Sequence, residues 1–122
     1  MATAKKTIFA VDDSKSNLVV ISDALSDRYR VFTLSSGERL FKMLEKLMPD
    51  LILLDVEMPD MDGREVLTNL KNDSRFQHIP VIFLSSLDSN EAEPQWFSMG
   101  AAAYMAKPFS KPLLLEAIEK HL

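Results

Sequence analysis

Cysteine is absent from this 122-residue sequence, and histidine occurs only at His78 and His121. Without cysteine the chain has no disulfide, no thiolate metal site and no cysteine nucleophile. Because soft and nitrogen ligands are so scarce, any metal ion that the protein binds is expected to be a hard cation with oxygen ligands.

Long apolar runs and an excess of positive charge are also missing. No stretch is long and apolar enough to span a bilayer, and residues 1–6 lack the apolar core of a signal peptide. The formal net charge of −4 argues against direct binding to nucleic acid or acidic membranes. We therefore expect a cytoplasmic protein with a single domain, 1–122, in which residues 1–6 form a loose N-terminal tail.

Five short apolar segments have the composition of β-strands. The third, residues 51–54, is a run of four large aliphatic residues, which suits a strand that is buried on both faces. The other four expected strands are Thr7–Val11, Arg30–Leu34, residues 79–84 and Ala103–Ala106.

Helical patterns separate the strands. The predicted inward faces consist of Leu18, Ile21 and Leu25; Leu40, Phe41, Leu44 and Leu47; Val66, Leu67 and Leu70; and Leu114, Ile118 and Leu122. Ser14 or Asp13 would cap the first helix and Ser110 the last. A fourth helix within 88–99 is the least regular, and its securest turn is 95–99. The repeated strand–helix order predicts an α/β fold, a doubly wound five-stranded parallel sheet with helices on both faces.

Residues capable of chemistry stand at the ends of the central strands. Asp12 and Asp13 follow the first strand, Asp55 ends the third, Ser85 follows the fourth and Lys107 the fifth. In a parallel sheet these ends share one edge, where ligands bind. Three carboxylates brought together repel, so the site calls for a cation or raised pKa values. Mg²⁺ fits such a site, which is suited to phosphoryl transfer with Asp55 as the nucleophile.

Each residue also has a plainer interpretation. Asp55 would only start a turn, Asp13 would cap a helix, and Lys107 would be a solvated strand end. Ser85 would be a turn residue, and Tyr104, the aromatic residue three positions before Lys107, would pack in the core. Singly these are the better interpretations, but together they require five coincidences.

The same residues resemble the receiver domain of bacterial response regulators, the phosphoacceptor proteins of two-component systems. The matching motifs are Asp12-Asp13, Asp55 with Met58-Pro59 and Asp62-Gly63, Ser85, and Lys107-Pro108-Phe109. They stand in the family's order and spacing, and the resemblance covers residues 7–122. It implies a flavodoxin-like sheet with strand order 2-1-3-4-5.

The resemblance implies a role for each position. Asp55 would accept a phosphoryl group from a histidine kinase, a phosphotransfer protein or a small phosphodonor. Asp13, Asp55 and the backbone carbonyl of Glu57 would bind Mg²⁺ directly, and Asp12 would bind it through water. Lys107 would pair with the resulting aspartyl phosphate.

The resemblance further implies a switch rather than an enzyme with a separate substrate. Ser85 would move to bond the phosphoryl group, Tyr104 would swing inward with it, and the Lys107–Pro108 bond would be cis. The face formed by the fourth helix, fifth strand and fifth helix would then control homodimerisation, an output domain or a target protein. Residues 107–122 are similar to receivers that precede domains for cyclic di-GMP synthesis or breakdown.

Some positions depart from the family pattern. Glu57 occupies a position that varies among members of the family and that influences their dephosphorylation. Its carboxylate would therefore compete for the metal or change the lifetime of the phosphoryl group. Ser86 replaces the usual small residue, and Trp96, close to Pro94, is more often a packing residue than a partner contact.

Three alternatives remain open. A haloacid-dehalogenase-like phosphatase would need a second aspartate where Glu57 stands, and a cap insertion for which the chain has no room. A flavodoxin-like FMN carrier would need a phosphate-binding loop in place of Asp12-Asp13-Ser14-Lys15. The third is a receiver-like interaction module that signals without phosphorylation.

Overall fold

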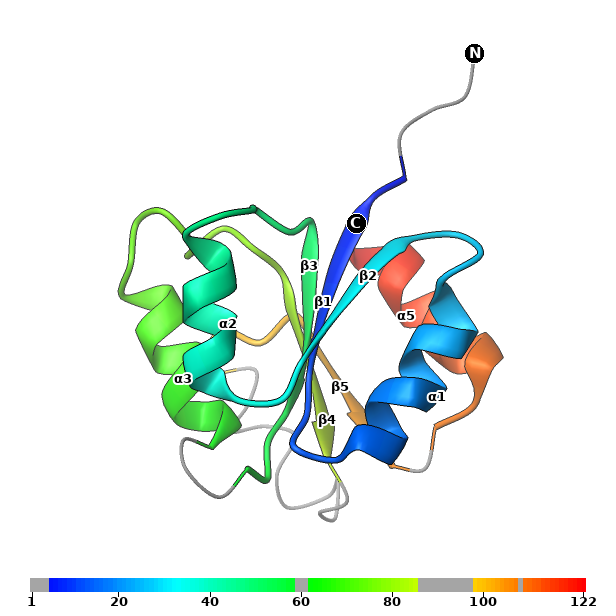
Figure 1. Cartoon of the computed structure of the whole chain (residues 1–122). Coiled ribbons are helices and arrows are strands. Elements are labelled where there is room, and N and C mark those ends of the chain that lie inside the picture. Colours follow the sequence, from blue (N-terminus) through cyan, green and yellow to red (C-terminus); the bar gives the residue numbers. More distant parts are fainter. Residues whose placement is uncertain (1–4, 59–61, 86–97, 108) are drawn as a thin grey trace.

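A five-stranded parallel sheet forms the centre of the computed structural model (Figure 1). The structure describes residues 5–58, 62–85, 98–107 and 109–122. The sheet has the order β2-β1-β3-β4-β5, so the predicted fold and strand order are confirmed. The elements are β1 (Thr7–Val11), α1 (Lys15–Leu25), β2 (Arg30–Leu34), α2 (Gly37–Leu44), β3 (Leu51–Asp55), α3 (Gly63–Lys71), β4 (Val81–Ser85), β5 (Ala103–Ala106) and α5 (Lys111–His121).

Helices cover both faces of the sheet. Figure 1 shows α1 and α5 on one side and α2 and α3 on the other. Because successive strand residues point to opposite faces, each central strand supplies both cores. In β3, Leu51 and Leu53 pack towards α1 and α5, whereas Ile52 and Leu54 pack towards α2 and α3.

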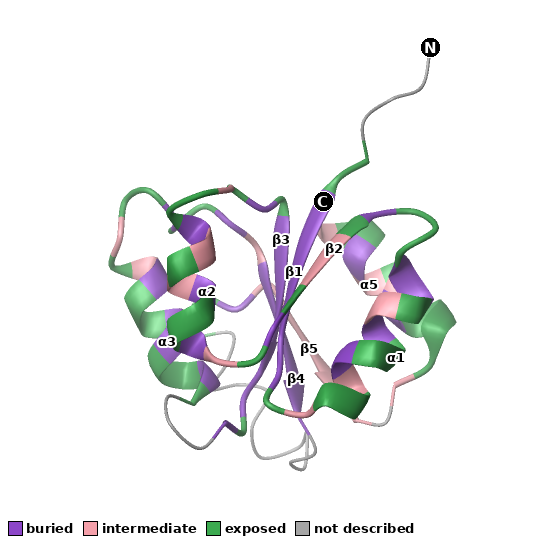
Figure 2. Cartoon of the chain, in the orientation of Figure 1, coloured by how far each residue is buried: buried purple, intermediate pink, exposed green. Residues whose placement is uncertain are grey.

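The three central strands are wholly buried, as Figure 2 shows. Burying one aliphatic or phenylalanine side chain completely stabilises the fold by about 1.5–3 kcal/mol, so this core dominates the stability of the fold. It holds the strand ends in fixed positions, and the tips of β1, β3 and β4 therefore provide a rigid support for the residues that follow them.

Side-chain caps begin the helices, and those of α1 and α5 are serines that the sequence predicts. The Ser14 hydroxyl accepts a hydrogen bond from Asn17 N at the start of α1, and Ser110 accepts from Leu113 N at the start of α5. Asp62 caps α3 by accepting from Glu65 N at 3.0 Å. These caps fix where each helix leaves the edge of the sheet.

Three boundaries differ from the sequence prediction. β4 begins at Val81 rather than at residue 79, because Pro80 has no N–H to give to the sheet. α2 ends at Leu44, so Leu47 lies beyond the helix, although it still packs partly against the core. The prediction that Leu122 faces inward is wrong, because α5 ends at His121 and Leu122 is 45% exposed.

Several predictions fall outside the described residues. These are most of the fourth helix, with Ser86, Pro94 and Trp96, and the cis bond before Pro108. Among the described helices, none combines the length and the apolar character that crossing a membrane would require.

Candidate functional site

The predicted site residues meet at the carboxyl edge of the sheet. Asp55 and Ser85 end the neighbouring strands β3 and β4, and Asp12 directly follows β1. Backbone bonds extend the sheet past these ends, since Val56 N donates to Leu84 O and Lys107 N donates to Ser85 O. These bonds keep the ends of the strands in register, so the side chains that the strand ends carry face one site.

One ammonium group joins the two buried carboxylates. Lys107 Nζ lies 3.1 Å from Asp12 Oδ2 and 3.0 Å from Asp55 Oδ1. Asp12 is fully buried and Asp55 is 2% exposed, so both charges have lost nearly all of their contact with water. A buried carboxylate needs such a partner, because an unpaired charge there costs several kcal/mol.

The N-terminus of α1 also holds Asp12. Ser14 N donates to its Oδ1 at 2.9 Å, and Asn17 Nδ2 donates to its Oδ2 at 3.2 Å. Sequence reasoning did not find Asn17, whose only signal is its place in the first turn of α1, five residues after Asp12. These bonds orient the Asp12 carboxylate before any ligand arrives.

The surroundings of Asp55 disfavour its ionised form. Burial, followed by the nearby charge of Asp12, raises the pKa of Asp55 to about 6 from its ordinary 3.8, although Lys107 opposes the shift. For Lys107 itself, burial favours the neutral amine, but the two carboxylates together outweigh it and raise its pKa. One lysine is therefore not enough to neutralise the cluster.

The two oxygens of Asp55 differ in their contacts. Oδ1 accepts hydrogen bonds from Lys107 Nζ and, at 3.2 Å, from Glu57 N. Within the described part of the chain, no donor reaches Oδ2. This second oxygen is therefore the one that can attack an electrophile without first losing a hydrogen bond.

Asp13 completes an acidic cluster with the two buried carboxylates. One carboxylate oxygen from each of Asp12, Asp13 and Asp55 lies within 4.8 Å of the others, and Asp13 is exposed. Three oxygen donors with excess negative charge, open to water on one side, fit a hard divalent cation such as Mg²⁺. The raised pKa of Asp55 fits the same need for a further positive charge.

Ser85 and Tyr104, the predicted switch residues, lie on neighbouring strands. Ser85 is fully buried and donates a hydrogen bond to Glu57 Oε1 at 2.8 Å. The sequence singled out Glu57 for its charge but gave no sign of this bond. Tyr104 is half-buried and packs against the core on the α2 and α3 side.

Gly63 lets α3 approach the end of β3. A Cβ at this position would lie 2.6 Å from Asp55 O and 2.7 Å from the Val56 Cα. Gly63 N also donates to Val56 O at 2.9 Å. Any side chain here would therefore push against the backbone that carries Asp55.

Replacing Gly63 with alanine is expected to lower the free energy of unfolding by about 1–3 kcal/mol, since backbone atoms cannot move aside as a flexible side chain can. Urea denaturation measures this change. Asn69→Ala on the exposed side of the same helix is the control and should shift stability by less than about 0.5 kcal/mol. Equal stabilities for Gly63→Ala and wild type would contradict the close approach.

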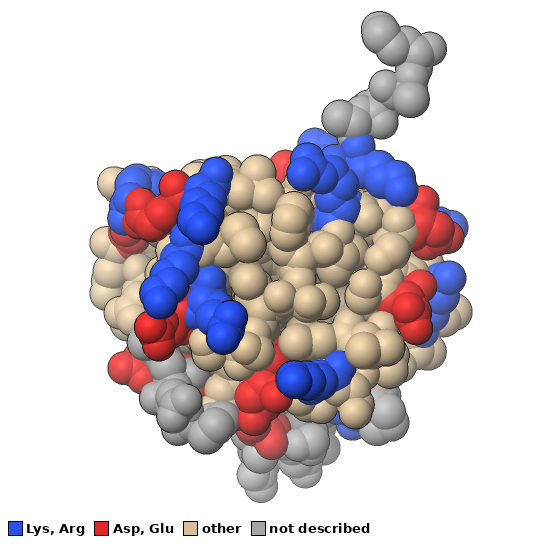
Figure 3. Space-filling view, viewed as in Figure 1, with Lys and Arg blue, Asp and Glu red and all other residues tan. Residues whose placement is uncertain are grey.

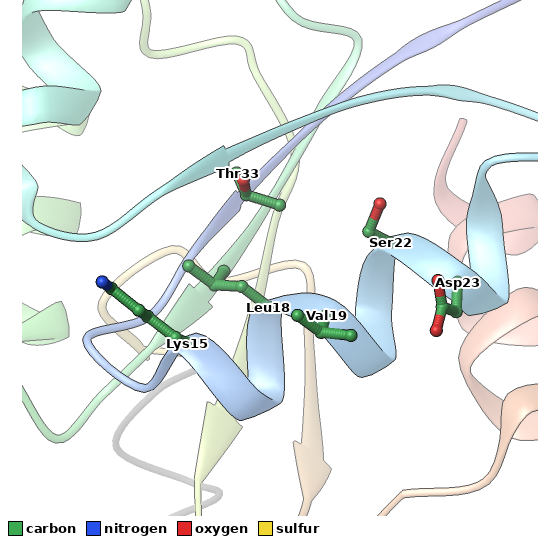
Figure 4. Close-up of a pocket in the computed structure, with 6 residues that line it drawn as sticks. All are labelled: Lys15, Leu18, Val19, Ser22, Asp23 and Thr33. Carbon is green, nitrogen blue, oxygen red and sulfur yellow. The ribbon is translucent and has the colours of Figure 1, made fainter.

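Two adjoining surface grooves lie away from the carboxylates. One of about 350 Å³ runs between α1 and β2 and is lined by Lys15, Leu18, Val19, Ser22, Asp23 and Thr33 (Figure 4). An adjoining groove of about 380 Å³ carries Arg39, Lys42 and Lys46 on the α2 side, where Figure 3 shows a line of basic side chains. Neither of these two grooves is lined by Asp12, Asp13 or Asp55.

Comparison with known proteins agrees with this arrangement. The family model for the response regulator receiver domain matches residues 8–119. A probable cyclic di-GMP phosphodiesterase of Vibrio cholerae is 40% identical over 95% of this chain, which spans 26% of that relative's length.

Solved structures share this fold over nearly the whole of both chains compared. The chemotaxis protein CheY4 of Vibrio cholerae has a TM-score of 0.91 and 31% identity, covering 98% of this chain and 100% of its own. The receiver domain of the sensor histidine kinase PA1611 from Pseudomonas aeruginosa has a TM-score of 0.87 and 25% identity over 97% and 98% of the two chains. That structure is described with a magnesium ion in its active-site cleft. With its parallel sheet, its edge of carboxylates and a family match over almost its whole length, this chain belongs to the response regulator receiver domain family.

Proposed function

We propose that the domain is a phosphorylation-dependent switch in which Asp55 accepts the phosphoryl group. The observation that carries this proposal is the asymmetry of Asp55, with Oδ1 held by Lys107 and by Glu57 N and with Oδ2 left for attack. Attack of Oδ2 on phosphorus forms an acyl phosphate while the bond from phosphorus to the donor's nitrogen or oxygen breaks. The departing group keeps the bonding electrons, and a nitrogen leaving group also takes up a proton.

The charge arrangement supports the same role. Lys107 already lies between Asp12 and Asp55, so its ammonium can follow the negative charge outward when the phosphoryl group is added. Asp13, Asp55 and the Glu57 carbonyl would hold Mg²⁺ directly, with Asp12 acting through water. When bound, the ion would offset charge on the phosphoryl oxygens during transfer.

The signal would leave the site through β4 and β5. Phosphorylation adds about two negative charges at Asp55. The Ser85 hydroxyl would turn to bond the phosphoryl group, and Tyr104 on the adjacent strand would move inward with it. Activation is then a population shift between two packings of the β5–α5 side, including the predicted fourth helix.

The partners follow from this mechanism. A histidine kinase or phosphotransfer protein would supply the phosphoryl group. A groove of about 480 Å³ along β5 and α5, lined in part by Tyr104, Phe109 and Leu113, would receive a second copy or a target protein. The phosphodiesterase relative suggests an output in cyclic di-GMP turnover, carried by other domains. The domain itself would act on no separate substrate and bind no nucleic acid.

The direct test is intact-mass measurement after incubation with acetyl phosphate or phosphoramidate. The wild-type protein should gain the mass of one phosphoryl group with Mg²⁺ and none with EDTA. No gain under either condition would favour the receiver-like module that signals without phosphorylation. A gain that is equal with EDTA would remove the metal from the proposal.

A further inference from the structure

The side chain of Glu57 reaches back across the site to the end of β4. Its Oε1 accepts a hydrogen bond from the fully buried Ser85 hydroxyl at 2.8 Å, while its backbone N–H donates to Asp55 Oδ1 at 3.2 Å. Glu57 thus contacts both Asp55, at the end of β3, and Ser85, at the end of the neighbouring strand β4. The Ser85 bond is short, as expected for a hydroxyl that donates to a charged carboxylate.

We propose that Glu57 is a positioning residue that holds the Ser85 hydroxyl in the unphosphorylated state and competes with the phosphoryl group for it. The inference rests on the proposed function and adds an internal competitor to it. It follows from the number of protons: a serine hydroxyl has one, so a strong bond to Glu57 and a strong bond to a phosphoryl oxygen exclude each other.

Charge adds to this competition. A carboxylate and a phosphoryl group that share one buried donor are two anions at close range, which repel each other. Phosphorylation should therefore expel the Glu57 carboxylate from Ser85 into the solvent, to which Glu57 is already exposed. The bond between Glu57 and Ser85 consequently favours the inactive state, and its removal should favour the phosphorylated one.

A double-mutant cycle on beryllofluoride binding tests the proposal, because this anion mimics a phosphoryl group on Asp55 without turnover. At saturating Mg²⁺, calorimetric titration of Glu57→Ala should show about tenfold tighter binding than wild type, the size expected for one lost competing hydrogen bond. In the Ser85→Ala background the same change should have an effect of less than about threefold, because no hydroxyl remains to compete for.

A neutral variant of the same size as glutamate separates the hydrogen bond from long-range charge. Glu57→Gln keeps an acceptor oxygen but removes the charge, so it should tighten binding less than Glu57→Ala does. Equal effects of Glu57→Ala with and without the Ser85 hydroxyl would overturn the inference, because Glu57 would then act through charge alone. Weaker binding by Glu57→Ala would overturn it as well. If the wild type binds no beryllofluoride, the proposed function fails and the inference fails with it.

Discussion

Replacing Asp55 with asparagine is expected to abolish the Mg²⁺-dependent gain of a phosphoryl group. The amide oxygen that would occupy the position of Oδ2 is a poor nucleophile, and the carboxylates that remain cannot substitute for it. The Asp12 carboxylate already accepts hydrogen bonds from Ser14, Asn17 and Lys107. Asp13 lies beyond the end of β1, so the sheet does not fix its position for attack. Intact mass after treatment with phosphoramidate measures the loss, which should be complete within detection.

Two controls make this result specific. Asp73→Asn removes a partly exposed carboxylate that pairs with Arg75 outside the site, and it should leave phosphorylation unchanged. Treatment with hydroxylamine should remove the phosphoryl group from the wild type, because an acyl phosphate is cleaved by this nucleophile and a serine ester is not. A modification that persists in Asp55→Asn, or that resists hydroxylamine, would place the acceptor elsewhere.

The same substitution is expected to stabilise the fold at neutral pH when no metal is added. The pKa of Asp55 is about 6 in the folded protein and 3.8 ordinarily. Between these values the folded state holds a proton that the unfolded state has released, so stability falls as the pH rises through this window. Each unit is worth about 1.4 kcal/mol, so the ionised carboxylate costs the wild type up to about 3 kcal/mol at pH 7.

Urea denaturation of wild type and Asp55→Asn at pH 4 and pH 7 measures this effect. The difference in unfolding free energy should move in favour of asparagine by up to about 3 kcal/mol between the two pH values. Asp73→Asn should show almost no change between pH 4 and pH 7, because the side-chain bond from Arg75 lowers the pKa of Asp73 and so places its titration below this range. A difference that does not change with pH would contradict the raised pKa of Asp55.

The strands and the convergence of their ends could be predicted because they depend on few residues. Four consecutive aliphatic residues before Asp55 are compatible with only a narrow set of buried elements, and a parallel sheet then places Asp12 and Lys107 at the same edge. What each side chain contacts there depends on rotamers and on atomic distances. The Lys107 bridge between two carboxylates and the bond from Ser85 to Glu57 therefore emerged only from the structure.

Element ends were predicted less well for a local reason. Leu122 fits the helical period of Leu114 and Ile118, but periodicity cannot show that α5 has no further turn to hold it inward. Similarly, Ile79 has the apolar character of a strand, yet its amide bonds back to Phe76 O in a turn before Pro80. Hydrophobic pattern identifies the element, whereas backbone hydrogen bonding decides its last residue.

The uneven burial of the sheet has a mechanical consequence. β1, β3 and β4 are buried throughout, whereas every residue of β5 is at least partly accessible. The middle of the sheet is therefore stiff and its β5 margin is compliant, because distortion costs least where the fewest packed contacts are lost. Under the proposed function, a change at Asp55 would distort the stiff centre of the sheet least and the β5 margin most. A partner protein would then detect the change at this margin rather than at the core.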